Sequence, residues 1–181
     1  MNHLTIPEIK KLLSEVHNDR HKTMILTTLC HGLRASEVIN MVREDIQGGH
    51  VKVSRLKGSD KTIQPFVVSD DPELDESRRL TELYNNTKPK EKLFQITRQG
   101  FYALMRRAGD RAGILSHKCH PHSLKHSCAM DAVARLPINA AQKYLGHKSL
   151  ASTGHYTKIS DAKASRLFAN GFGMGIMEDD D

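Results

Sequence analysis

His120-Pro121-His122-Ser123-Leu124-Lys125-His126 opens the part of this sequence, residues 120–156, that decides the fold. A proline suits the first turn of a helix, so the apolar residues after Pro121 predict a helix that starts here. In that helix His122, Lys125 and His126 would stand at positions i, i+3 and i+4 and share one face. Three hydrogen-bond donors would then lie close together.

The same part of the sequence contains a second helix end. Pro137 suits the first turn of a helix, and Gly146 suits its left-handed C-terminal cap. His147 would therefore emerge just beyond this helix, and Tyr156 follows nine residues later. The two helix ends predict a site that combines phosphate-binding side chains with a phenol that can act as a nucleophile.

Upstream, the first quarter of the chain is predicted to be helical. A capping box predicts a helix over 7–16, and an apolar stripe predicts a second helix over 21–33. A third helical pattern follows, with Ser36 as its expected cap. Arg34 would lie at the junction between these helices, where a buried cation needs an anionic partner.

The middle of the chain predicts a small sheet. Alternating apolar residues over 50–56 and a returning apolar run over 63–68 indicate two strands, joined by a hairpin turn with Lys57 and Lys61 at its mouth. Helices are expected over 77–84 and from residue 101 to Gly113. The predicted fold class is α+β, mainly helical, with a small antiparallel β-sheet.

Composition predicts one domain with a short appendage. The chain has 181 residues, 38% of them hydrophobic, which is adequate for one core. Residues 1–170 are expected to form the domain, with a last helix over 162–168, and residues 171–181 a mobile acidic tail. No apolar run approaches a membrane-spanning length, and the first residues lack a secretion signal. Three cysteines without Cys-x-x-Cys spacing argue against a disulfide framework and fit a reducing cytoplasm.

The charge balance predicts a polyanionic partner. The formal net charge is +6, but residues 1–177 carry 27 basic and 17 acidic side chains, a balance of +10. Basic proteins of this kind bind nucleic acids, because each neutralised phosphate releases counterions. The alternative from charge alone is a basic protein that has no polyanionic partner.

The motifs, in this order, resemble the catalytic domain of the tyrosine recombinase (phage integrase) family. They are residues 29–37 (Leu-Cys-His-Gly-Leu-Arg-Ala-Ser-Glu), the lysine hairpin, His122 to His126, Leu145-Gly146-His147 and Tyr156. The match runs from Thr5 to about Ala162. The chain looks particularly similar to the short bacterial recombinases that invert promoter DNA for fimbrial phase variation.

The resemblance implies a site-specific recombinase that cleaves and rejoins DNA through a 3′-phosphotyrosyl intermediate, in integration, excision or inversion. It implies that Tyr156 is the nucleophile, that Arg34 binds the non-bridging oxygens and that Lys57 protonates the leaving 5′-oxygen. His122 and His147 would hydrogen-bond the phosphate or relay protons. No metal or other cofactor is expected.

Lys125 departs from the family pattern, which usually has arginine at this position. Lysine keeps the charge but loses the planar fork that grips two oxygens at once. It is assigned to the catalytic set with this change. The alternative function is a catalytically impaired DNA-binding regulator on the same scaffold.

The resemblance also implies partners. Double-stranded DNA at specific recombination sites is expected, with self-association into a tetramer on paired sites, possible accessory DNA-bending proteins and a cytoplasmic, nucleoid-associated location. The residues expected to contact DNA are Arg34, Lys57, Lys61, Arg106, Lys125 and Lys148.

Several residues have simpler alternative interpretations. Lys61 could take the role of Lys57, and His126 could have a structural role, bracing its helix against the sheet. The arginines of the helix that ends at Gly113 (Arg106, Arg107 and Arg111) could be a solvated face. A zinc site is an alternative for His117, Cys119, His120, His122 and His126, but their spacing matches no standard zinc motif.

Overall fold

A computed structural model of the chain describes residues 3–54, 61–148 and 150–154. Within these ranges the helices are α1 (Ile6–Ser14), α2 (Asp19–His31), α3 (Ala35–Val38), α4 (Glu76–Asn85), α5 (Arg98–Arg111), α6 (Pro121–Arg135), α7 (Ile138–Leu145) and α8 (Leu150–Gly154), with the short 3-10 turns η1 (Arg43–Asp45) and η2 (Ser116–Lys118). The strands are β1 (Ile46–Gln47), β2 (His50–Val53) and β3 (Thr62–Pro65). Four expectations lie outside the described residues: the last helix over 162–168, the domain boundary at 170, Lys57 and Tyr156.

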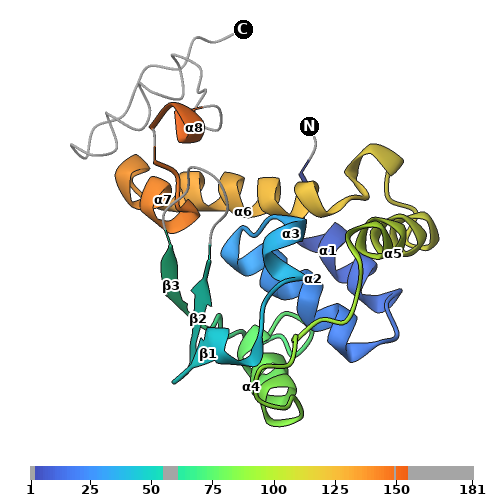
Figure 1. Ribbon diagram of the computed structural model, residues 1–181. Helices are drawn as coiled ribbons and strands as arrows, with labels where there is room; N and C mark the ends of the chain where they lie inside the picture. Colours follow the sequence, from blue (N-terminus) through green and yellow to red (C-terminus); the bar gives the residue numbers. More distant parts are fainter. Residues whose placement is uncertain (1–2, 55–60, 149, 155–181) are drawn as a thin grey trace, which may run out of the picture.

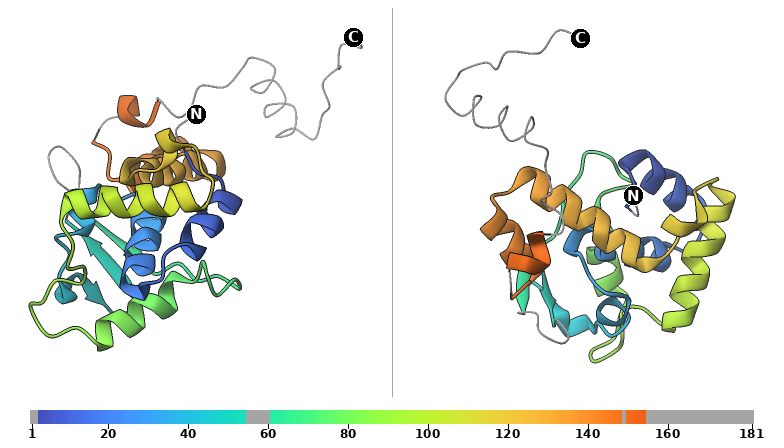
Figure 2. Two further views of the ribbon diagram at one scale, coloured as in Figure 1. Left: turned by 90° about the vertical axis from the view of Figure 1, so that its right-hand side faces the viewer. Right: turned by 90° about the horizontal axis from the view of Figure 1, so that it is seen from above.

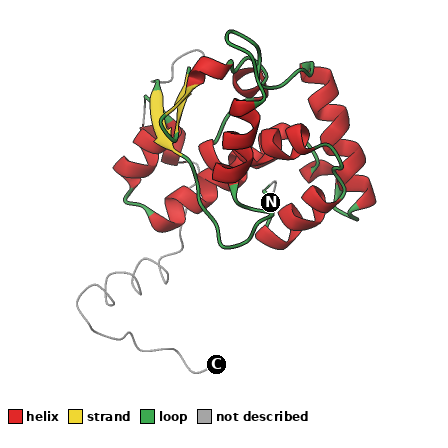
Figure 3. Ribbon diagram, turned by 90° about the horizontal axis from the view of Figure 1, so that it is seen from below, coloured by secondary structure: helices red, strands yellow, loops and turns green. Residues whose placement is uncertain are grey.

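Helices form most of the molecule, and the sheet lies at one edge of it (Figures 1 and 3). The three strands are antiparallel in the order β1-β2-β3, with Val51 opposite both Ile46 and Gln64. Helix α6 runs across one end of the helical part (Figure 2), and α7 and α8 follow it above the end of β3 (Figure 1). The predicted fold class, a mainly helical α+β domain with a small antiparallel sheet, is confirmed.

Helix α2 is the centre of the core. It packs against α4 on one side and α6 on the other, and its residues Met24, Ile25 and Leu26 are almost completely buried. The same core continues through the inward side of β2 and through Phe101 of α5. No helix in the described part of the chain is long and apolar enough to span a membrane.

The predicted capping box is present at the start of α1. The hydroxyl of Thr5 accepts a hydrogen bond from the backbone N–H of Glu8, and the carboxylate of Glu8 accepts one from the N–H of Thr5 at 2.8 Å. One residue earlier, the N–H of Leu4 donates to the hydroxyl of Ser127 in α6 at 2.8 Å. The first described residues are thereby tied to the helix that begins the decisive stretch.

Two helix starts differ from the prediction. Ser36 is not a cap: α3 is a single turn whose N-cap residue is Arg34, because the carboxylate of Glu37 accepts the N–H of Arg34 at 2.7 Å. Pro137 is the residue before α7 and does not lie within its first turn. Gly146 ends α7 in the left-handed conformation, at φ 66°, as predicted.

The sheet is also shorter than predicted. β3 ends at Pro65, because the N–H of Val67 donates to the side chain of Glu76 in α4 and not to a neighbouring strand. β2 ends at Val53. Strand β1 and helix α8 were not predicted, because two residues and five residues are too short to show a periodic pattern.

A close contact between α5 and the start of α6 gives a stability prediction. A β-carbon at Gly109 would overlap the sulfur of Cys119 and lie 2.8 Å from its β-carbon. Gly109→Ala should therefore destabilise the protein by about 1–3 kcal/mol, as overpacking of a tight core does. Urea unfolding followed by circular dichroism would measure this.

The double variant Gly109→Ala/Cys119→Gly serves as the control, because it adds a side chain at position 109 and removes the side chain at position 119 that would clash with it. It should recover part of the lost free energy of unfolding. A single variant as stable as the unchanged protein would show that α5 and the segment before α6 separate easily.

Candidate active site

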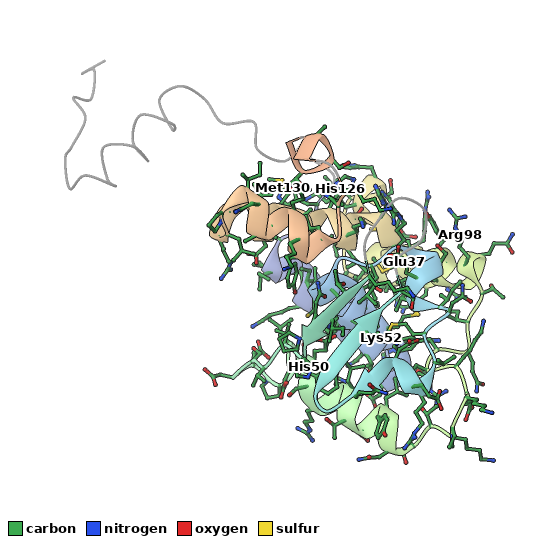
Figure 4. The ribbon with its side chains drawn as sticks, turned by 60° about the vertical axis from the view of Figure 1, so that its left-hand side comes forward. Glu37, His50, Lys52, Arg98, His126 and Met130 are labelled. Atoms are coloured by element: carbon green, nitrogen blue, oxygen red, sulfur yellow. The ribbon has the colours of Figure 1, made fainter. Side chains whose placement is uncertain are left out.

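Arg34 lies at the junction of α2 and α3, and a buried carboxylate orients it. The guanidinium Nη1 of Arg34 donates to Oε1 of Glu37 at 2.8 Å, while Oε2 of the same carboxylate accepts the backbone N–H of Arg34. The Arg34 side chain is 38% exposed and that of Glu37 is 1% exposed. Glu37 therefore fixes one edge of the guanidinium from inside the protein, while the side chain of Arg34 stays partly exposed. Figure 4 labels Glu37 on its short helix below α6.

Gly32 gives this junction its shape. It ends α2 in the left-handed conformation at φ 59°, which favours glycine. A β-carbon there would also lie 3.1 Å from the sulfur of Cys128 in α6 and 3.1 Å from a methyl group of Leu145 in α7. Only glycine lets the end of α2 approach α6 and α7 this closely, and Arg34 follows two residues later.

Lys125 contacts the same junction from α6. Its ammonium donates to the carbonyl oxygen of Gly32 at 3.0 Å, and the residue is only 4% exposed. A buried ammonium is costly unless oxygen atoms surround it, and a helix end supplies carbonyl oxygens that the helix itself does not use. Lys125 thus adds a positive charge directly behind the Arg34 loop.

The three donors predicted to share one face of this helix have different surroundings in the structure. The rings of His122 and His126 meet edge to face, with centroids 4.4 Å apart, and His122 is exposed. Lys125 is turned towards α2 and is buried. The ammonium of Lys125, one turn after His122, donates to the carbonyl of Gly32. His122 is the second residue of α6, and within the described part of the chain no hydrogen bond joins it to α2.

Partial burial is the largest influence on the pKa of His122 and lowers it below the usual range of a histidine. The further causes are the charges of His126, Lys125, His120 and Arg34, which also lower it. This interaction places His122 within the electrostatic reach of both Arg34 and Lys125. A neutral imidazole at pH 7 can both donate and accept a hydrogen bond.

His120 has a structural task. Its ring nitrogen Nδ1 accepts the N–H of Ser123 at 3.2 Å and so caps the start of α6. His120 and His122 stack with ring centroids 6.4 Å apart. Among residues 3–54, 61–148 and 150–154, no group of three or more His, Cys, Asp or Glu side chains is placed to hold a metal ion.

His147 follows the end of α7, and two neighbours hold it. The side-chain amide of Gln142 donates to the carbonyl of His147 at 2.9 Å, and the N–H of His147 donates to the carbonyl of Gln142. Ring atom Nδ1 lies 3.1 Å from the hydroxyl of Thr153, which is fully buried in α8. Thr153 therefore sets the orientation of the imidazole ring.

Three further predicted DNA contacts lie among the described residues and are exposed. Lys61, Arg106 on α5 and Lys148 all have exposed side chains, which leaves them available to a polyanion. Arg111 has a structural role instead, because its guanidinium donates to the backbone carbonyl and the side chain of Glu15 and ties α5 to the end of α1.

The sequence interpretation missed the residues that orient the site. Glu37 had a detectable signal, because a glutamate three residues after Arg34 has the spacing of a capping box. Gln142 and Thr153 had none, because their contacts depend on how α7 ends and where α8 begins. Figure 4 shows His126 and Met130 one turn apart on α6.

Comparison with known proteins gives one consistent family. The model of the phage integrase family matches residues 2–163. The type 1 fimbriae regulatory protein FimB of Escherichia coli (strain K12) is 32% identical over 169 residues, covering 86% of this chain and 84% of FimB. The tyrosine recombinase XerA of Pyrococcus furiosus is 34% identical over 172 residues, covering 87% of this chain and 57% of XerA.

Solved structures share the fold. The Tn1549 transposon integrase in complex with circular intermediate DNA has a TM-score of 0.76 at 18% identity, covering 94% of this chain and 66% of that one. The catalytic domain of bacteriophage HP1 integrase has a TM-score of 0.68 at 18% identity, covering 96% of this chain and 97% of the domain. The described chain therefore has the extent of one such catalytic domain, and less than the full length of the longer relatives.

The lowered pKa values predict how stability depends on pH. Burial, followed by nearby charges, lowers the pKa of both His122 and His126 in the folded protein. The unfolded chain therefore binds more protons than the folded protein does once the pH falls below about 6.5, the usual pKa of histidine. This contribution to stability is complete above that pH and is lost as the pH falls through it. His126→Gln should flatten the dependence of Tm on pH between about 7.5 and 5.5.

Differential scanning calorimetry at several pH values would test this. His17→Gln replaces an exposed histidine that follows α1 and is the matched control, expected to keep the wild-type slope. An unchanged slope in the His126 variant would contradict the assignment of the pH dependence to this cluster.

Proposed function

The chain belongs to the phage integrase family, and from this membership we propose that it is a site-specific recombinase of double-stranded DNA. It cleaves and rejoins strands through a 3′-phosphotyrosyl intermediate. The observation that carries this proposal is the guanidinium of Arg34, held by the buried carboxylate of Glu37 and backed by the buried ammonium of Lys125. A partly exposed cation that is oriented by a buried carboxylate is better suited to binding a phosphodiester than to forming a surface ion pair.

The phosphate is the part of the substrate that these groups bind. Attack on a phosphodiester gathers negative charge on its non-bridging oxygens, and donors fixed in advance stabilise that charge most effectively. Arg34 supplies the planar fork and Lys125 a second positive charge. His122 follows the first residue of α6 and His147 follows the end of α7, and in this proposal both rings hydrogen-bond the same group.

The proton steps of the proposed reaction balance within the protein. The phenol of Tyr156 gives its proton to a histidine, His122 or His147, as its oxygen forms a bond to phosphorus. The bond from phosphorus to the 5′-oxygen breaks, and Lys57 protonates that oxygen as it leaves. A 5′-hydroxyl from another strand can then attack the phosphotyrosine and reverse each step. Because the covalent intermediate preserves the phosphoester bond energy, the proposed chemistry requires neither ATP nor a metal ion.

The partners of this reaction are double-stranded DNA and further copies of the chain. Exchange between two duplexes requires four cleavages, so we propose a tetramer on paired sites, with accessory DNA-bending proteins at those sites. The excess of basic residues supports a DNA partner. A location in the cytoplasm, at the nucleoid, follows from a DNA substrate and is part of the same proposal.

A covalent adduct is the first predicted outcome. A nicked duplex that loses a short strand on cleavage should trap the chain as a protein–DNA adduct that survives denaturing electrophoresis. Tyr156→Phe should abolish the adduct, because it removes the attacking oxygen, and should retain DNA binding in a gel shift. Binding by the wild-type chain without any adduct, on a substrate carrying its own site, would favour the DNA-binding regulator instead.

Lys125→Arg is the second variant with a predicted outcome. Arginine is usual in the family at this position, and its fork adds a directed donor to the charge that lysine already provides. The cleavage rate should rise, by up to about 100-fold if one full oxyanion donor is regained. Nonspecific DNA affinity should stay nearly constant, because the charge is the same.

Lys118→Arg is the matched control. Lys118 also carries a partly buried ammonium, but it pairs with Glu8, so the same exchange there should leave cleavage unaffected. A Lys125→Arg variant that cleaves no faster would show that the carbonyl of Gly32 already holds Lys125 in a productive position.

A further inference from the structure

A buried hydrogen-bond network links the end of α2 to the end of α7 through β3. Its central residue is Gln64, which is 3% exposed. The amide nitrogen of Gln64 donates to the backbone carbonyl of Tyr144 in α7 at 2.6 Å, and its amide oxygen faces Nδ1 of His31 in α2 at 2.5 Å. One side chain of the sheet thus joins two helices that are 113 residues apart in the chain, from His31 to Tyr144.

The hydrogen positions in this network follow from its geometry. The carbonyl of Tyr144 can only accept, so the nitrogen of the Gln64 amide must face it and the amide oxygen must face His31. Nδ1 of His31 therefore carries a hydrogen. Nε2 of His31 lies 3.0 Å and 3.1 Å from the two carboxylate oxygens of Glu76 in α4, which is fully buried. A second proton joins these two groups, so the end of α2 is also fixed to α4.

A second link bypasses the sheet. The hydroxyl of Tyr144 donates to the backbone carbonyl of Cys30 in α2 at 2.5 Å. Tyr144 therefore binds β3 with its carbonyl and α2 with its side chain. The two links end one residue apart in α2, at Cys30 and His31.

The spacing of these residues relates them to the candidate active site. His31 lies three residues before Arg34, and Tyr144 lies three residues before His147. Both separations include a left-handed glycine, Gly32 and Gly146, that ends the helix. A turn of this kind is short and stiff, so the position of the last helical residues sets the position of the side chain beyond the glycine.

We propose that Gln64 and Tyr144 are positioning residues that set the separation of Arg34 and His147 around the phosphate. This proposal rests on the proposed function, because it assigns those two side chains to one substrate. Neither residue touches the DNA itself. A displacement of about 1 Å between groups that bind one reacting phosphate can lower a rate by about 100-fold, which is why two redundant links matter here.

Two variants remove the links and preserve volume. Gln64→Met replaces an amide by a thioether of similar length, and Tyr144→Phe removes one hydroxyl. Each single variant should lower the single-turnover cleavage rate by about 3- to 10-fold, because the other link remains. The double variant should lose about 100-fold, at least the product of the two single losses. DNA affinity should be unchanged in all three.

Thr28→Val is the matched control. It is isosteric, lies fully buried in the same helix α2, and removes one buried hydrogen bond, from the Thr28 hydroxyl to the carbonyl of Met24. A merely structural loss lowers the fraction of active protein, and hence the amplitude of the reaction, without changing its rate constant. The control should show this pattern, whereas the double variant should show a lower rate constant at wild-type amplitude.

Hydrogen exchange of the protein without DNA separates the two proposals. In the double variant the amides of α7 should exchange faster, while in Thr28→Val they should match the wild type. If the wild-type chain forms no adduct, the proposed recombinase function fails. Hydrogen exchange in α7 then still tests whether Gln64 and Tyr144 hold α7 in place. Wild-type exchange in α7, or a wild-type rate constant for the double variant, would overturn the positioning role.

Discussion

The close approach of three helices at Gly32 is the constraint on which the site depends. Any larger residue would push the end of α2 away from Cys128 of α6 and Leu145 of α7. The carbonyl oxygen of the same glycine accepts a hydrogen bond from Lys125. The residue that allows the close packing therefore also supplies a partner for a buried charge. Arg34 is oriented only because the chain leaves the helix at this point and in this direction. Packing and electrostatics are therefore joined at one residue.

Much of this arrangement could be predicted from the sequence, because its signals are local. The local patterns predicted α1, α2, α4, α5, α6 and α7, and Gly146 predicted the left-handed cap at the end of α7. The left-handed cap that Gly32 forms at the end of α2 was not predicted. The alternation of apolar residues predicted β2. The family resemblance then supplied roles for side chains that adjoin these caps, and the family itself is confirmed.

The orienting contacts could not be predicted, because they join residues that are distant in sequence. Gln64 lies 33 residues from His31 and 80 from Tyr144, and nothing in the local pattern distinguishes it from a surface glutamine in a strand. The burial of Lys125 was missed for the same reason, since its partner is 93 residues away. The predicted cap at Ser36 was wrong because α3 begins after Arg34, whose backbone N–H donates to the side chain of Glu37. Local propensity predicts where helices lie, but long-range packing decides which polar side chains they bury.

The hydrogen bond between Leu4 and Ser127 has a consequence for synthesis on the ribosome. It joins residues 123 apart, and the contact between Gly32 and Lys125 joins residues 93 apart. The first helices leave the ribosome long before α6 has been translated, because translation adds only about 5–20 residues each second. For several seconds α1 and α2 must exist without the helix that covers them, with the apolar side of α2 exposed to chaperones and to other nascent chains. The contact between the end of α2 and Lys125 consequently forms only after α6 has been translated.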